Sequence, residues 1–238
     1  MFKVNSALIL YFIASILYVF AVLIGSDNLE LFSKPIIIPS IYYFYYISVR
    51  GKIDYLFTFS VVSFFIGEIL YVINRDDFNI VGLVFLLIPY FFVLYYIAHD
   101  LLYYLKEKKI KLNKFSFYII VMLLLYLFIN VLIMIEDNSL EFFIYAVFAT
   151  LLLFMGILAF VMLINYSNRT ILYTGFMVGC FLISDLFYVF SKKIPDLLAL
   201  KMINVITQEL SFFCYISYFI YRTKFRMYSK PNSLKASK

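Results

Sequence analysis

Residues 181–192 read Phe-Leu-Ile-Ser-Asp-Leu-Phe-Tyr-Val-Phe-Ser-Lys, which places a serine and an aspartate inside an apolar run. Residues 64–75 read Phe-Phe-Ile-Gly-Glu-Ile-Leu-Tyr-Val-Ile-Asn-Arg and echo that arrangement, with a small residue again preceding the acid. On a helix, the residues four before and three after the acid share its face. The two predicted stripes are Phe64, Glu68 and Tyr71 in the earlier segment, and Phe181, Asp185 and Tyr188 in the later one. The rest of the chain is interpreted as a scaffold for these two acids.

The composition is that of a membrane protein. Of the 238 residues, 65% are hydrophobic and 14% are charged, and the mean hydropathy is +0.97. A water-soluble domain carries about 25% charged residues, and one core of this length would not bury so many apolar side chains. A helix satisfies its own backbone hydrogen bonds in lipid. We therefore expect an all-α integral membrane protein of the cell membrane.

Several function classes are disfavoured by the residues present. Cys180 and Cys214 fall inside apolar runs and are interpreted as small buried residues rather than a disulfide framework. His99 is the only histidine, which argues against a His-based metal site or a Ser-His-Asp triad. His99 and Asp100 are interpreted as interface residues. We expect no metal, no cofactor and no nucleic-acid partner; the expected partner is a membrane lipid.

About eight runs are long enough to cross a bilayer, at roughly 20 apolar residues per span. The predicted spans are 6–25, 35–49, 54–73, 80–104, 115–135, 140–165, 171–190 and 202–221. The second is the weakest, and Pro35 and Pro39 are interpreted as marking its start. If it is counted, Glu68 and Asp185 each lie on the third helix of a four-helix half, which is compatible with two parallel repeats.

The positive charges predict the orientation. Most of the 20 Lys and Arg residues fall on the side that holds the N-terminus, the 106–114 loop and the C-terminus. Such a bias marks the cytoplasmic side, so both termini are expected there. Residues 1–222 are expected to form one transmembrane domain, and 223–238 a basic cytoplasmic tail.

Depth along the spans, at ~1.5 Å per residue, predicts a polar layer in the outer leaflet. Glu68, Asp185, Glu209 and Asn130 are expected at similar depth, with Lys34 at the outer mouth. Ionisable groups inside a membrane are expensive and should face inward and pair. Structural alternatives remain open for each: hydrogen bonding of the acids to tyrosines, snorkelling of Glu209, and interhelical contacts of Asn130 and Gln208.

Short motifs in this order resemble the YhhN/lysoplasmalogenase family of multi-span membrane proteins. They are Lys34-Pro35, Gly67-Glu68, Ser184-Asp185 and Gln208. The resemblance implies hydrolysis of the vinyl ether bond of lysoplasmalogen, or a related ether lysolipid, to an aldehyde and a glycerophospho-base. It departs from the family pattern at three positions: Glu68 replaces an aspartate, Pro89 stands where a histidine is frequent, and Val205 where a tyrosine is frequent.

This chemistry needs an acid that keeps its proton near neutral pH and a carboxylate beside it. Two neighbouring buried carboxyls supply both roles, so Asp185 and Glu68 are the candidate catalytic residues. The candidate substrate-binding residues are Lys34, Tyr71, Asn130, Ser184, Tyr188, Gln208 and Glu209. Paired intramembrane acids also occur in proton-coupled or small-solute transporters, and a lipid-binding protein without enzymatic activity is a third reading.

Overall fold

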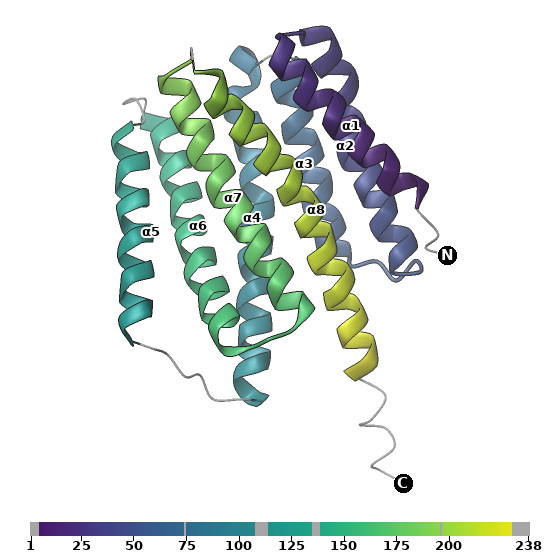
Figure 1. Ribbon diagram of the computed structural model, residues 1–238, viewed down its shortest axis with the longest axis vertical. Coiled ribbons are helices and arrows are strands. Elements are labelled where there is room, and N and C mark those ends of the chain that lie inside the picture. The colour runs from purple at the N-terminus through teal and green to yellow at the C-terminus, as the bar shows by residue number, and fades with distance from the viewer. Residues whose placement is uncertain (1–4, 74, 108–113, 135–138, 196, 230–238) are drawn as a thin grey trace.

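The computed structural model describes residues 5–73, 75–107, 114–134, 139–195 and 197–229. These residues form eight α-helices and no strand, which confirms the all-α prediction (Figure 1). The helices are α1 (Ser6–Ile24), α2 (Asp27–Ser48), α3 (Tyr55–Ile73), α4 (Arg75–Glu107), α5 (Lys114–Met134), α6 (Ser139–Asn165), α7 (Arg169–Lys193) and α8 (Leu198–Ser229).

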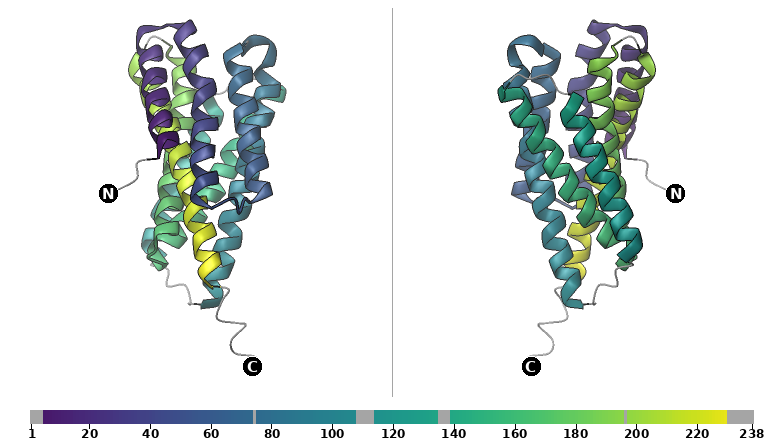
Figure 2. Two further views of the ribbon diagram at one scale, coloured as in Figure 1. Left: turned by 90° about the vertical axis from the view of Figure 1, so that its right-hand side faces the viewer. Right: turned by 90° about the vertical axis from the view of Figure 1, so that its left-hand side faces the viewer.

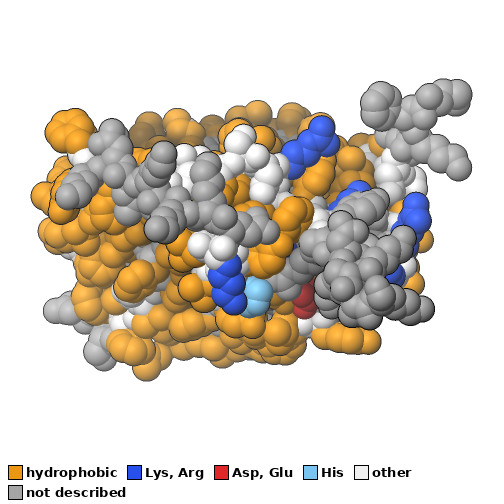
Figure 3. Space-filling model, turned by 90° about the horizontal axis from the view of Figure 1, so that it is seen from below, with side chains coloured by type: hydrophobic (Ala, Val, Ile, Leu, Met, Phe, Trp, Pro, Cys, Tyr) orange, Lys and Arg blue, Asp and Glu red, His pale blue; other side chains and the backbone are white. Residues whose placement is uncertain are grey.

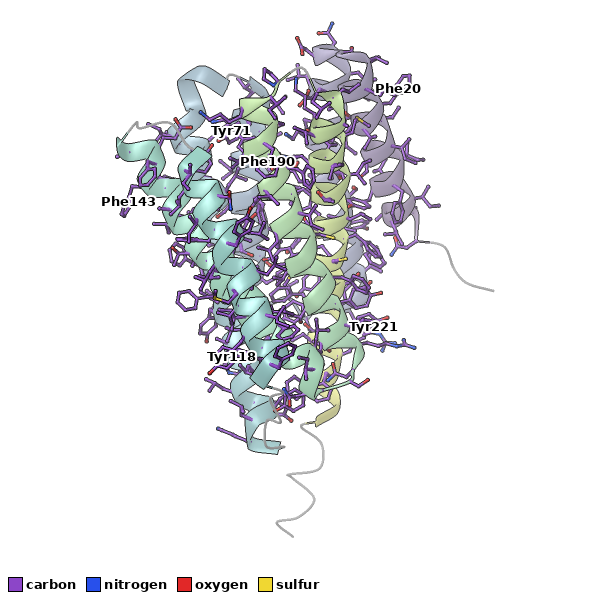
Figure 4. The ribbon with its side chains drawn as sticks, turned by 60° about the vertical axis from the view of Figure 1, so that its left-hand side comes forward. Phe20, Tyr71, Tyr118, Phe143, Phe190 and Tyr221 are labelled. Atoms are coloured by element: carbon purple, nitrogen blue, oxygen red, sulfur yellow. The ribbon has the colours of Figure 1, made fainter. Side chains whose placement is uncertain are left out.

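Five of these helices are long and apolar enough to cross a membrane, as judged on the described residues. They are α1, α3, α6, α7 and the Ile80–Lys106 part of α4. Helix α5 contains a shorter apolar stretch, Phe117–Asn130. Large apolar side chains such as Phe20, Tyr118 and Phe143 point outward from the bundle, as lipid-facing residues do (Figure 4). The chain is therefore a helical protein suited to a membrane.

Local signals explain where the helices begin and turn. The side chain of Asn5 accepts a hydrogen bond from the Ala7 N–H at 3.0 Å, and that of Asn168 accepts one from Ile171 at 2.9 Å. Both are N-caps of the following helix. Gly25 ends α1 with a φ of 66°, the left-handed conformation that glycine adopts at little cost. The chain can therefore reverse at once into α2.

Pro35 and Pro39 do not mark the start of the second helix, contrary to the prediction. Helix α2 begins at Asp27, so both prolines lie well inside it. Asp27 and Glu30 occupy the first turn, where acidic side chains favour the N-terminal end of the helix dipole. The start of α2 was predicted too late, at residue 35, because the prediction used only the apolar run and the first residues of the helix are polar.

The helices pack as antiparallel neighbours, with α8 along the middle of the bundle. Helix α8 contacts α7 on one side and α1 and α2 on the other, and α3 pairs with α4. Helix α5 lies at the edge, where it packs on α6 and α7 (Figure 1). The side views show α3 and α4 in a layer separate from α1 and α8 (Figure 2). The turns joining α1 to α2, α3 to α4 and α7 to α8 share one end, which we call the turn end.

A buried ionic cluster lies at the opposite end of the bundle. The Arg222 guanidinium pairs with Asp100, with Nε 2.9 Å from both carboxylate oxygens, and its Nη1 lies 3.9 Å from Asp54. Tyr218 donates to Asp100 at 2.6 Å, and Tyr96 donates to Asp54 at 2.6 Å. The cluster ties α4 and α8 to the start of α3.

One prediction about this end was wrong, and one helix extends further than expected. Arg222 is only 5% exposed, and α8 continues beyond residue 222, the predicted end of the transmembrane domain, to Ser229. Residues 230–238 of the predicted tail lie outside the described residues. Asp100 is buried rather than at the interface, because it neutralises Arg222, while its neighbour His99 is exposed. Figure 3 shows lysine, arginine and histidine side chains on this end of the molecule.

Aromatic rings fill the bundle between this cluster and the turn end. The rings of Phe57 and Phe219 stack with centroids 3.9 Å apart. Phe64 packs on Tyr215 at 5.9 Å and on Phe181 at 6.0 Å. The last contact joins the phenylalanines of the two Phe–acid–Tyr segments across the interior of the bundle.

Candidate functional site

A cavity of about 540 Å³ lies toward the turn end of the bundle and is lined by residues from all eight helices. Gly25 and Asp27 from the first turn, and Lys201 near the start of α8, contribute to it. Its volume is in the range of pockets that hold small molecules. The predicted site residues that line it are Lys34, Glu68, Tyr71, Ser184, Asp185, Tyr188 and Gln208.

Glu68 is held by two donors from other helices. The Lys34 ammonium lies 2.8 Å from its Oε2, and Gln208 Nε2 donates to its Oε1 at 2.5 Å. The Lys34 ammonium also lies 5.1 Å from the centroid of the Tyr18 ring, a cation–π contact. Glu68 is 5% exposed. Both Glu68 oxygens accept a hydrogen bond, and one of the donors is the Lys34 ammonium. This arrangement suits an ionised carboxylate in a fixed position.

Asp185 has a different environment. Tyr90 donates a hydrogen bond to its Oδ2 at 2.7 Å. No lysine or arginine of the described residues forms an ion pair with it. Asp185 and Glu68 line the same cavity. The cavity therefore contains one carboxyl that is matched by a cation and one that is not.

The small residue before each acid makes a helix contact. A Cβ on Gly67 would lie 2.8 Å from the Leu86 side chain of α4, closer than real contacts allow. Ser184 and Asn204 join α7 to α8: Asn204 Nδ2 donates to the Ser184 carbonyl at 3.2 Å. Adjacent residues on a helix point in different directions. The small residue thus lets its helix pack closely, and the acid that follows lines the cavity, together with Ser184 in the case of α7.

Glu209, predicted to bind substrate, does not line the cavity. Its side chain points toward α1, on a different face of α8 from that of Gln208. Its Oε2 accepts a hydrogen bond from Ser15 at 2.7 Å, and its carbonyl accepts one from Tyr11. Glu209 thus connects α8 to α1.

Asn130 is also outside the cavity, contrary to the prediction. Helix α5 presents Leu124, Leu127 and Phe128 to the cavity. Asn130 lies on a different face and donates to the Tyr126 carbonyl of its own helix at 2.7 Å. Equal depth along the helix was insufficient, because the direction of the side chain around α5 decides the contact.

Sequence reasoning missed the partners that the acids find across the bundle. Tyr90 donates to Asp185, and Asn204 supports Ser184. Lys192, at the end of α7, lies 2.9 Å from Glu141 and 3.0 Å from the Tyr145 hydroxyl. Tyr90 does carry a signal, because it falls on the buried face of α4 at helical spacing from Leu83. The other contacts have no comparable signal.

The cysteines were predicted to be small buried residues of separate spans. Cys214 is buried and Cys180 is partly exposed, and both are free thiols. They belong to α7 and α8, which pack against each other. Neither lines the cavity, so they belong to the scaffold.

Comparison with known protein families, curated proteins and solved structures finds no match to this chain. The described residues contain no group of three or more His, Cys, Asp or Glu arranged to hold a metal ion. The function is therefore argued from the geometry of the cavity.

Proposed function

We propose that this protein is a membrane-embedded hydrolase that cleaves the vinyl ether bond of lysoplasmalogen or a related ether lysolipid. The observation that supports this most is the unequal pair of carboxyls in one cavity. Glu68 is bound to Lys34, whereas Asp185 is bound only to the neutral Tyr90 hydroxyl among the described residues. The resemblance of the short motifs to the YhhN/lysoplasmalogenase family agrees with this function.

The unequal environments assign the two roles. A buried carboxyl without a cation is less costly in its neutral form than as an anion, so Asp185 carries the transferable proton. The Glu68 carboxylate, fixed by Lys34 and Gln208, supplies the negative charge. This is the pattern of paired acids whose environments separate their protonation states.

The reaction then proceeds in balanced steps. Asp185 delivers its proton to the β-carbon of the vinyl ether, and the C=C electron pair forms the new C–H bond. The oxocarbenium ion that results is stabilised by the nearby negative charge. Water adds to that cation and loses a proton to a carboxylate. The hemiacetal then releases the glycerophospho-base and leaves the aldehyde.

The position in the membrane is part of the proposal. All eight helices cross the bilayer, and the turn end, with the cavity, lies toward the outer leaflet. Charged groups at the bilayer centre cost about 2.5–3.5 kcal/mol each on insertion scales, and the Lys34–Glu68 pair avoids part of that cost. The division into two parallel four-helix repeats remains a prediction, and the packing of Phe64 on Phe181 is compatible with it.

The proposed orientation gives a labelling result. Asp27 and Lys52 are exposed residues at opposite ends of α2. In a Cys180→Ser/Cys214→Ser background, Asp27→Cys should react with a membrane-impermeant maleimide in intact cells. Lys52→Cys should react only after permeabilisation, because its loop is cytoplasmic. The reverse pattern would move the cavity to the inner leaflet.

The function is tested with a matched pair of substrates. Purified protein should release aldehyde from a vinyl ether lysolipid and leave the saturated alkyl ether analogue intact, since only the former can be protonated at carbon. Proteoliposomes should show no proton or solute flux. If both lipids are left intact, the proposed reaction is wrong.

Neighbouring residues of α8 provide a second check. Gln208→Leu removes the donor to Glu68, so kcat/KM should fall by at least about tenfold, as for loss of a hydrogen bond to a charged group. Glu209→Gln, one position away, should change kcat/KM only a few-fold at most, because Glu209 faces Ser15. Equal losses in the two variants would contradict the assignment of the cavity face.

One observation favours a transporter as the second candidate. The molecule holds two buried ionic groups, Lys34–Glu68 and Asp100–Arg222, at opposite ends. Alternating-access proteins use polar groups of this kind near their gates. The aromatic packing of Phe57 on Phe219 fills the space between them. A flux assay in proteoliposomes separates this candidate from the hydrolase.

A further inference from the structure

Helix α7 presents two different faces to the cavity. Asp185 and Ser184 belong to its polar face, near Glu68 and Gln208. Leu182, Leu186 and Val189 also line the cavity, and their spacing of four and three residues places them along one stripe. The acid is therefore flanked on its own helix by an apolar stripe.

Helices α5 and α6 complete an apolar region opposite that stripe, which we call the apolar arm. Its residues from these helices are Leu124, Leu127, Phe128, Phe148, Ala149, Leu152 and Leu153. A Cβ on Gly156 would lie 3.0 Å from Leu124 and 3.5 Å from Leu182, so the three helices converge there. The arm contains none of the charged lining residues.

The charged lining residues other than Asp185 come from helices other than α5 and α6. Asp27, Glu30 and Lys34 come from α2, Glu68 comes from α3, and Lys201 comes from α8. Helix α2 packs with α1, α3 and α8, away from α5 (Figure 1). The cavity is thus amphipathic, with charges toward α2 and hydrocarbon toward α5, and with Asp185 on the helix between them.

Helix α5 forms one outer wall of the apolar arm. Helix α5 packs on α6 and α7. Its opposite face is exposed, including Met122 at 67% and Tyr126 at 65%. In a membrane that face contacts lipid, so α5 forms the wall between the arm and lipid on that side.

We propose that the apolar arm holds the single hydrocarbon chain of the substrate and that the α5 side chains lining the arm, Leu127 among them, limit the chain length accepted. The proposal rests on the function proposed above, because it takes the polar end as the reaction site. A single-chain lipid fits the amphipathic division, with its chain in the arm and its polar end toward Lys34 and Lys201. The bond to be cleaved, which joins chain and head, then lies beside Asp185.

The test uses non-cleavable alkyl ether lysophospholipids of increasing chain length as probes, and measures their affinity for the full-length protein by calorimetry. Leu127→Trp should weaken binding of long chains by about tenfold, as overpacking does, and spare short ones. Leu127→Ala should shift the preference to longer chains. The matched control, Met122→Trp, adds similar bulk to the lipid-facing side of α5 and should leave the profile unchanged.

The outcomes distinguish the proposal that the arm binds the hydrocarbon chain from the proposal of vinyl ether hydrolysis. A shifted chain-length profile in protein that cleaves no vinyl ether would support the arm and reject the proposed hydrolysis. A profile that is the same for wild type, Leu127→Ala and Leu127→Trp would overturn the arm, even if hydrolysis is found. If Leu127→Trp does not fold, the shift in Leu127→Ala decides.

Discussion

Asp185→Asn is expected to abolish vinyl ether hydrolysis, with kcat lowered by at least about 10²-fold, the usual contribution of general acid catalysis. The amide keeps the shape of the side chain and can still accept the hydrogen bond from Tyr90, but it has no proton of suitable acidity to give to carbon. Turnover of a vinyl ether lysolipid in detergent is the measurement.

The folding control for this variant is its thermal melting temperature. Asparagine is cheaper in an apolar setting than an ionised carboxylate, so Asp185→Asn should melt at or above the wild-type temperature. A variant that melts like wild type and turns over normally would make Asp185 a structural polar group only.

Lys34→Met should lower the free energy of unfolding by about 3–5 kcal/mol, the cost of removing one partner of a buried ion pair. The side chains of Lys34 and Glu68 are 12% and 7% exposed, so the carboxylate left behind has little access to water. Activity should also be lost, because Glu68 is no longer fixed. Unfolding in detergent with a chemical denaturant measures the change.

A double variant separates the pair from the individual side chains. Lys34→Met/Glu68→Gln removes both charges and should recover most of the stability but none of the activity. Lys52→Met, at an exposed lysine of the α2–α3 connection, is the matched control and should change stability by no more than about 0.5 kcal/mol. A stable Lys34→Met single variant would contradict the ion pair.

The helices were largely predictable from the sequence because apolar runs in a membrane protein are set by the bilayer. The helical spacing of Phe64, Glu68 and Tyr71 predicted a shared face, and both acids line one cavity. What failed was the treatment of polar residues at helix ends. Helix α2 starts at Asp27 because acidic side chains in its first turn favour the N-terminal end of the helix dipole. Arg222 is buried because it pairs with Asp100.

The candidate site was predictable in part. Lys34 and Gln208 were expected near the acids, and the structure joins them to the same carboxylate. Depth alone wrongly included Asn130 and Glu209, since a helix rotates by about 100° per residue and only one face meets the cavity. The Tyr90 contact depends on how α4 packs against α7, which no local pattern specifies.

The most direct test is to run the reaction in heavy water and examine the aldehyde. If Asp185 protonates the β-carbon, the proton comes from a carboxyl that exchanges with solvent. The aldehyde, trapped by reduction as it forms, should then carry one deuterium on the carbon next to the carbonyl carbon. Wild-type protein should give this product, and Asp185→Asn should give none. Aldehyde without that deuterium, or equal labelled product from Asp185→Asn, would contradict the account.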